Sequence, residues 1–89
     1  MIKADSIPTY NSKVAYRNID DQIVIVQPLD ENILTLNKTG SFIWTLIEKI
    51  SVDEIADEVV KKFEVNKDEA LKDVIELLTA LKEKNLIEI

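Results

Sequence analysis

The spacing of apolar residues changes once along this 89-residue chain, close to Asn37. Before that point, apolar residues occur in short runs or at alternate positions, which is typical of β-strands. After it, they recur every three or four residues, which is typical of amphipathic helices. A chain that places its strands before its helices favours an α+β domain, with helices packed on one face of a small antiparallel sheet.

The first part of the chain predicts three short strands in an antiparallel meander. Asp20 and Asp21 are turn residues between the first two strands, so these strands are expected to form a hairpin. Residues 1–12 are mostly polar and predict an extended segment, which leaves residues 13–89 as a single folded domain. The predicted strands cover residues 13–18, 22–27 and 33–37.

Three helices are predicted in the second part, and each follows a residue suited to cap its N-terminus. Ser51 and Glu54 have the spacing of a capping box, in which each side chain bonds the backbone of the other. Gly40, the only glycine, lies in the first of these helices, and we attribute it to close packing of the first turn. The predicted helices contain residues 40–48 behind Asn37, 52–63 behind Ser51 and 67–84 behind Asn66.

The residue types present exclude most catalytic chemistry. The chain has neither cysteine nor histidine, so disulfides and zinc–thiolate sites are excluded and the commonest general base is missing. Adjacent carboxylates such as Asp53-Glu54 fall in the first turns of predicted helices, where they favour the helix dipole. One glycine is too few for a glycine-rich phosphate loop. We therefore expect no enzymatic activity, no metal and no cofactor.

The charge and hydropathy of the chain limit which kinds of partner it can bind and in which cellular compartment it is expected. Its 17 acidic and 11 basic residues give a net charge of −6, whereas a nucleic-acid-binding surface needs clustered cations. We therefore expect neither nucleic acid nor an anionic membrane as a partner. The longest apolar run, Ile23–Val26, is too short to span a bilayer, and the first residues lack a signal-peptide core. These features predict a soluble cytoplasmic protein.

The last two predicted helices leave two interaction classes open. Residues 52–63 and 67–84 have the spacing of a helix-turn-helix pair, but the second of these helices carries more acidic than basic residues. A helix that reads DNA offers mainly basic or amide side chains, so DNA binding is not predicted. The remaining classes are a peptide-binding module and an acidic winged-helix adaptor or transcription-associated module that docks on a protein.

The apolar stripe of the last helix is unusually wide. At about 100° per residue it spans roughly 160°, whereas a core-facing stripe needs only a little over about 100°. One margin is therefore predicted to lie outside the core, although a small domain also needs a wide stripe to bury enough area. An unpaired strand edge beside such a margin suits the addition of a peptide as a β-strand. The stripe contains Ala70, Leu71, Val74, Ile75, Leu77, Leu78 and Leu81.

The order and spacing of several short motifs resemble a known family. The run "LN.TG..IW" is followed by an "S.DEIA" helix start, an "F.V....A..DV" stretch and a terminal "L..K.LI". From Val14 to Ile87 the chain resembles the PqqD-like family, also called RiPP recognition elements, which serve the biosynthesis of modified ribosomal peptides and of pyrroloquinoline quinone. The "TG" and "IW" pairs resemble the discrete recognition proteins of lasso-peptide and radical SAM pathways. The first run consists of Leu36, Asn37, Thr39, Gly40, Ile43 and Trp44.

The resemblance implies a winged helix-turn-helix fold and a non-catalytic, peptide-binding role. Such proteins bind the leader of a precursor peptide as an antiparallel strand, in the groove between their third strand and third helix. They present the precursor to a maturation enzyme, which is a radical SAM enzyme, a cyclase or a leader peptidase. Lys67 and Lys72 are then expected to meet acidic leader residues. The implied peptide-binding residues are Asn32, Ile33, Leu34, Thr35 and Leu36 of the strand and Lys67, Ala70, Leu71, Val74, Leu77, Leu78 and Leu81 of the helix.

Overall fold

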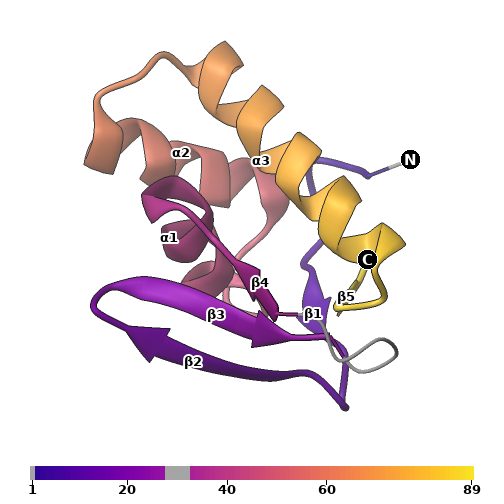
Figure 1. The fold of residues 1–89 in the computed structure, drawn as a ribbon. Helices are drawn as coiled ribbons and strands as arrows, with labels where there is room; N and C mark the ends of the chain where they lie inside the picture. Colours follow the sequence, from indigo (N-terminus) through magenta and orange to yellow (C-terminus); the bar gives the residue numbers. More distant parts are fainter. Residues whose placement is uncertain (1, 28–32) are drawn as a thin grey trace.

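A small antiparallel sheet and three helices form two layers in the computed structural model, which describes residues 2–27 and 33–89 (Figure 1). The helices all lie on one side of the sheet. This arrangement confirms the predicted α+β fold, a three-stranded antiparallel sheet followed by three helices. The elements are β1 (Thr9–Tyr10), β2 (Ala15–Ile19), β3 (Gln22–Val26), β4 (Ile33–Thr35), α1 (Lys38–Leu46), α2 (Val52–Phe63), α3 (Lys67–Glu83) and β5 (Ile87–Glu88).

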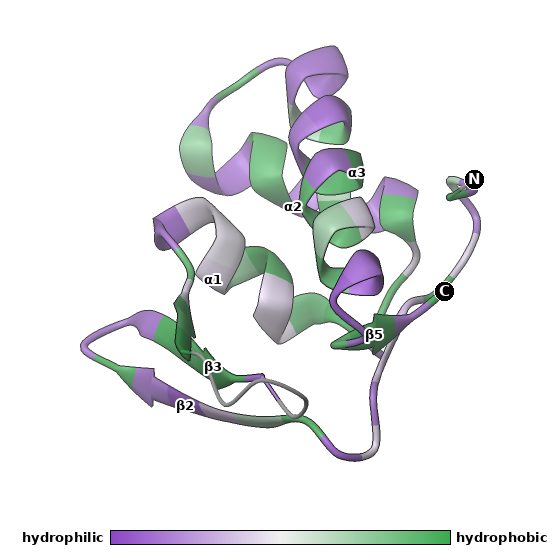
Figure 2. Cartoon of the chain, turned by 45° about the vertical axis from the view of Figure 1, so that its right-hand side comes forward, coloured by the Kyte–Doolittle hydropathy of each residue, from purple (hydrophilic) through white to green (hydrophobic). Residues whose placement is uncertain are grey.

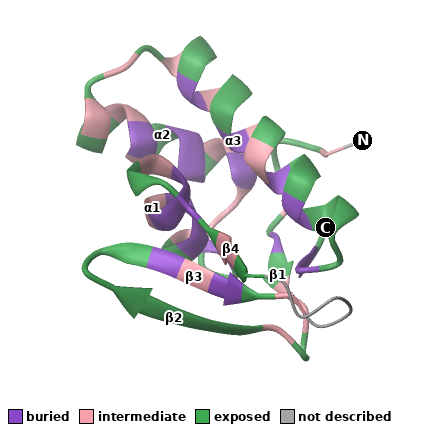
Figure 3. Ribbon diagram, viewed as in Figure 1, coloured by how far each residue is buried: buried purple, intermediate pink, exposed green. Residues whose placement is uncertain are grey.

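The main sheet has the order β2-β3-β4, and both of its pairings are antiparallel. Side chains alternate across it, so Ile23 and Ile25 of β3 are buried under the helices while Val24 and Val26 point to the outer face. Figure 3 shows the same alternation in β3 and shows β2 exposed along its whole length. The inner face of β3 is therefore the part of the sheet that anchors the core.

The predicted caps are confirmed at all three helices. The side chains of Asn37, Ser51 and Asn66 each accept a hydrogen bond from the backbone N–H three residues ahead. Glu54 completes the capping box of α2. Figure 2 shows α2 and α3 alternating between hydrophobic and hydrophilic along their length, as helices with one buried face do.

Helix α1 covers Lys38–Leu46 and ends two residues before the predicted limit at Glu48. Glu48 adopts a left-handed backbone conformation with φ of 72°, which no helix continues through. Its N–H donates instead to the carbonyl of Pro8, at 2.7 Å. The end of α1 is therefore set by a contact with the N-terminal segment, which lies far away in the sequence.

The N-terminal segment is built into the fold through its backbone. Strand β1 pairs with β5 near the end of the chain, and neither of these two-residue strands was predicted. The carbonyls of Ala4 and Ser6 accept from the N–H groups of Asp53 and Val52, in the first turn of α2. Free N–H groups of a helix start are thereby satisfied by another part of the chain. Residues 4–10 consequently hold α2 and β5 together.

The hairpin between β2 and β3 turns at Asp20 and Asp21, with φ of 51° and 65°. Two positive φ angles in a two-residue loop define a type I′ turn, for which Asn-Gly is the favoured pair. Non-glycine residues are strained in this conformation. Substitutions at these two exposed positions can therefore remove backbone strain without changing any packed side chain.

We expect the Asp20→Asn/Asp21→Gly variant to be more stable by about 1 kcal/mol, which corresponds to a melting temperature about 4–8 °C higher. Thermal unfolding followed by circular dichroism measures the change. The Asp20→Ala/Asp21→Ala variant removes the same two charges but disfavours positive φ, so it should be less stable than the unaltered chain. Equal stabilisation by both variants would assign the effect to charge and contradict the backbone explanation.

Candidate functional site

Strand β4 is an edge strand whose outer side has unpaired backbone groups. The N–H of Leu36 donates to the carbonyl of Ile23 at 2.9 Å, so this residue points toward β3. Backbone groups of successive strand residues point to opposite sides, so those of Ile33 and Thr35 point away from β3. No strand among the described residues pairs with that side. Two N–H and two C=O groups therefore form an open edge.

The serine hydroxyl of Ser41 joins this edge strand to α1. The N–H of Ile23 donates to Ser41 Oγ at 2.8 Å, and the Ser41 hydroxyl donates to the carbonyl of Leu36 at 3.1 Å. In a regular ladder, the Ile23 N–H would bond the Leu36 carbonyl directly. Ser41 is only 4% exposed and replaces that bond where the chain turns from strand into helix. It thus fixes the end of β4 against β3.

Gly40 packs closely against the cap of its own helix and the end of β4, and it also faces Leu77 of α3. A Cβ atom at this position would lie 3.2 Å from Asn37 Oδ1, 3.4 Å from the Cβ of Leu36 and 3.6 Å from a methyl group of Leu77. The first of these distances is shorter than an ordinary contact. The φ of Gly40 is not positive, so close approach and not backbone conformation accounts for the glycine. This agrees with the close packing inferred from the sequence.

A groove of about 420 Å³ opens beside this junction, between α1 and α3. Gly40, Ile43 and Leu77 give it an apolar part, and the carboxylates of Asp73 and Glu76 line it from α3. The groove lies just beyond the C-terminal end of β4, because Asn37, two residues after the strand, is one of its lining residues. The lining residues are Asn37, Thr39, Gly40, Ile43, Asp73, Glu76 and Leu77.

The strand residues of the predicted site differ in how accessible they are. Ile33 is 68% exposed and Thr35 is also exposed, whereas Leu34 is half-buried. Leu36 is buried in the core. Asn32 lies outside the described residues. Direct contact with a peptide is therefore available to the backbone of β4 and to the side chains of Ile33 and Thr35.

The helix residues of the predicted site fall into two groups. Ala70, Val74, Leu78 and Leu81 are fully buried in the core, so their side chains offer no surface to a peptide. Val74, Leu78 and Leu81 occupy the inner part of the apolar stripe, whereas Ala70 lies next to Leu77 at one margin and is nevertheless buried. Residues on both margins of the stripe are half-buried and pack against the core from its border: Leu71, Ile75 and Leu77. Only Leu77 lines the groove beside β4.

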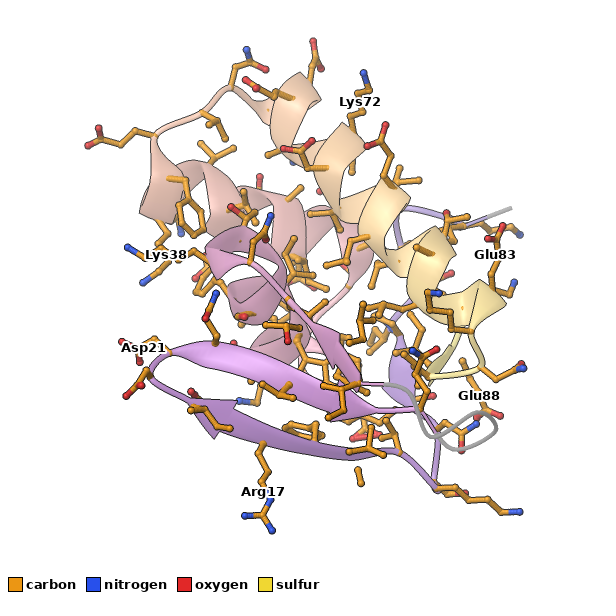
Figure 4. All side chains as sticks on the ribbon, viewed as in Figure 1. Arg17, Asp21, Lys38, Lys72, Glu83 and Glu88 are labelled. Atoms are coloured by element: carbon orange, nitrogen blue, oxygen red, sulfur yellow. The ribbon has the colours of Figure 1, made fainter. Side chains whose placement is uncertain are left out.

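The two lysines expected to meet a peptide do not face the groove. Lys67 Nζ lies 2.7 Å from Asp57 and 3.0 Å from Asp53, so it links α3 to α2. Hydrogen bonds to these two carboxylates raise the pKa of Lys67 above its usual value. Figure 4 shows Lys72 pointing away from the sheet. Sequence reasoning missed the ion pairs because the aspartates lie 10 and 14 residues before the lysine.

Trp44, part of the motif that resembles a known family, is an element of the core. Its ring is fully buried and packs against Tyr10 and Tyr16, at centroid distances of 4.9 and 5.2 Å. The Tyr10 hydroxyl donates to the Trp44 carbonyl, and burial raises the pKa of that hydroxyl. Trp44 Nε1 has no hydrogen-bond partner in the described part of the chain, and the ring meets Tyr16 edge to face. The cluster therefore joins α1 to β1 and β2.

Residues 2–27 and 33–89 contain no group of three or more carboxylate, histidine or cysteine side chains that is arranged to hold a metal ion. Across the same residues, every helix is too short or too polar to cross a membrane.

The bridging role of Ser41 predicts a clear cost for its removal. Ser41→Ala leaves the buried N–H of Ile23 unsatisfied, so we expect the free energy of unfolding to fall by about 1–3 kcal/mol. Urea unfolding followed by the fluorescence of Trp44 measures it. Ser12→Ala, at an exposed position, should change stability by less than about 0.5 kcal/mol. Equal stability of the two variants would show that the bridge contributes nothing.

Comparison with known proteins gives both a family match and structural matches. The sequence profile described as "PqqD: Coenzyme PQQ synthesis protein D (PqqD)" matches residues 22–87. A structure described as TbiB1 in complex with the TbiA(beta) leader peptide is similar at a TM-score of 0.82 and 28% identity, covering 90% of this chain and 94% of that one. Curated protein sequences gave no match.

Two more distant structures share the fold. A lasso peptide synthetase B1 complexed with the leader peptide has a TM-score of 0.82 at 21% identity, covering 94% of this chain and all of that one. The PqqD truncation of PqqCD from Methylobacterium extorquens, described as a functional, stand-alone RiPP recognition element, has a TM-score of 0.81 at 17% identity. That match covers 100% of this chain and 96% of the other.

Proposed function

The chain belongs to the PqqD family, and we propose that it is a non-catalytic protein that binds the leader of a ribosomally made precursor peptide. The observation that carries the proposal is the open backbone edge of β4 beside the groove between α1 and α3. The similarity to a protein described in complex with a leader peptide supports the same role.

The leader binds by adding to β4 as an antiparallel strand. Ile33 and Thr35 offer two N–H and two C=O groups, and each backbone bond contributes roughly 0.5–1.5 kcal/mol in water. Four such bonds give about 4 kcal/mol, which the loss of translational and rotational freedom on association offsets. Side chains of the leader must therefore supply the remaining affinity and the specificity. The groove beside β4, in which Leu77 is the partly accessible apolar side chain, is the surface that receives them.

The bound precursor is then presented to a maturation enzyme. The chain lacks cysteine and histidine, so the chemistry of modification belongs to the partner. A radical SAM enzyme, a cyclase and a leader peptidase are the partner classes consistent with the family. The leader lies along an exposed edge, so the segment that follows it remains free to enter an active site.

Blocking the open edge should weaken binding without unfolding the protein. Thr35→Pro removes an N–H that points away from β3, whereas the ladder with β3 keeps its bonds. We expect its affinity for a fluorescein-labelled leader peptide that binds the unaltered chain to fall at least tenfold. Fluorescence anisotropy measures the affinity, and circular dichroism checks the fold.

Asn18→Pro provides the matched control. Asn18 lies on β2, and by the same alternation its N–H points out of the opposite edge of the sheet. A proline there places the same change on an edge that the leader does not use, so affinity should be unchanged. Equal loss from both variants, or no loss from Thr35→Pro while its fold is intact, would contradict strand addition at β4.

A further inference from the structure

The groove at the end of β4 is acidic on the side formed by α3. Asp73, Glu76 and Leu77 are spaced three and four residues apart, so they lie on one face of the helix. Neither carboxylate forms an ion pair with another described residue, and neither lysine nor arginine is among the residues that line the groove. Negative charge is thus presented next to an apolar surface.

The cations of this region are directed elsewhere. Lys67 is held by Asp53 and Asp57 on α2. Lys38, on the first turn of α1, lines a separate groove on the other side of that helix, together with Lys62. The charge that a bound peptide meets beside β4 is therefore negative. This reverses the complementarity expected from the sequence, in which Lys67 and Lys72 attract acidic leader residues.

The direction of β4 also determines which part of a bound peptide lies opposite the two carboxylates. Strand β4 runs from Ile33 to Thr35 and continues through Asn37 into α1, so the groove lies beyond its C-terminal end. The N-terminal end of an antiparallel partner lies beside the C-terminal end of β4. Residues just before the strand-forming part of the peptide consequently meet the carboxylates of Asp73 and Glu76.

We propose that the groove selects leaders that carry a lysine or arginine together with a neighbouring apolar side chain, just before the segment that adds to β4. The basic group meets Asp73 and Glu76, and the apolar side chain packs on the half-buried Leu77. This inference rests on the proposed function, because it specifies the chemistry of the leader bound there. The net charge of −6 adds a long-range attraction for a basic peptide.

A random 12-residue peptide library displayed on phage tests the selection. The unaltered chain should enrich peptides with a lysine or arginine beside an apolar residue, and Asp73→Lys/Glu76→Lys should instead enrich acidic residues at that position. Asp5→Lys/Glu83→Lys makes the same change in net charge at exposed positions outside the groove, so it should keep the basic preference. Enriched peptides without a basic preference, or a preference unaffected by Asp73→Lys/Glu76→Lys, would overturn the inference.

The same selection separates this inference from the proposed function. If the unaltered chain enriches no peptide beyond those that Thr35→Pro enriches, binding at β4 itself is refuted. If peptides are enriched at the open edge without the charge preference, strand addition stands and the groove has no selectivity for charge.

A charge-swap experiment with one selected peptide measures the contact directly. Each carboxylate replaced by lysine should weaken binding about two- to fivefold or more at low ionic strength, and less at 0.5 M salt. Replacing the basic residue of the peptide by glutamate should restore binding to Asp73→Lys/Glu76→Lys. Failure of this rescue, with both variants folded, would assign the loss to packing and overturn the ionic contact.

Discussion

The rest of the structure depends on the junction at which a three-residue strand becomes a helix. The Ser41 hydroxyl occupies the place of a ladder bond between Ile23 and Leu36, so β4 stays paired although the chain has already turned into α1. A longer strand would carry α1 away from the sheet edge. The bridge instead holds the start of α1 against the end of β4, and Leu77 of α3 packs beside Gly40 at the same place. The open edge and the groove therefore both adjoin this junction between β4 and α1.

Most of the fold could be predicted because its signals are local. Periodicity located three strands and three helices, and the caps at Asn37, Ser51 and Asn66 fixed the helix starts. The features that were not predicted depend on contacts between residues that lie far apart in the sequence. Strands β1 and β5 are too short to show a period, and their pairing joins residues 9–10 to 87–88. The early end of α1 depends on a bond to Pro8.

The candidate site was predictable only in outline. An edge strand beside a helix follows from the order of elements, and β4 occupies that edge. Which side chains of α3 line the groove depends on the rotation of the helix, which a wide apolar stripe leaves open. Its centre at Val74 and Leu78 is sealed in the core, whereas Leu77 on one margin meets the groove. The charge of the site was equally hidden, because Lys67 is neutralised by aspartates of another helix.

The pairing of β1 with β5 has a consequence for how the protein is made. Thr9 and Glu88 are 79 residues apart, so their contact requires nearly the whole chain to be present. Closing so long a loop is entropically costly and contributes late in folding. During synthesis, β2, β3, β4 and α1 emerge from the ribosome before β5 exists, with the apolar inner face of the sheet still uncovered. The pairing of residues 9–10 with residues 87–88 can form only after β5 has emerged, whereas the bonds from Ala4 and Ser6 to the start of α2 need only the chain up to Asp53.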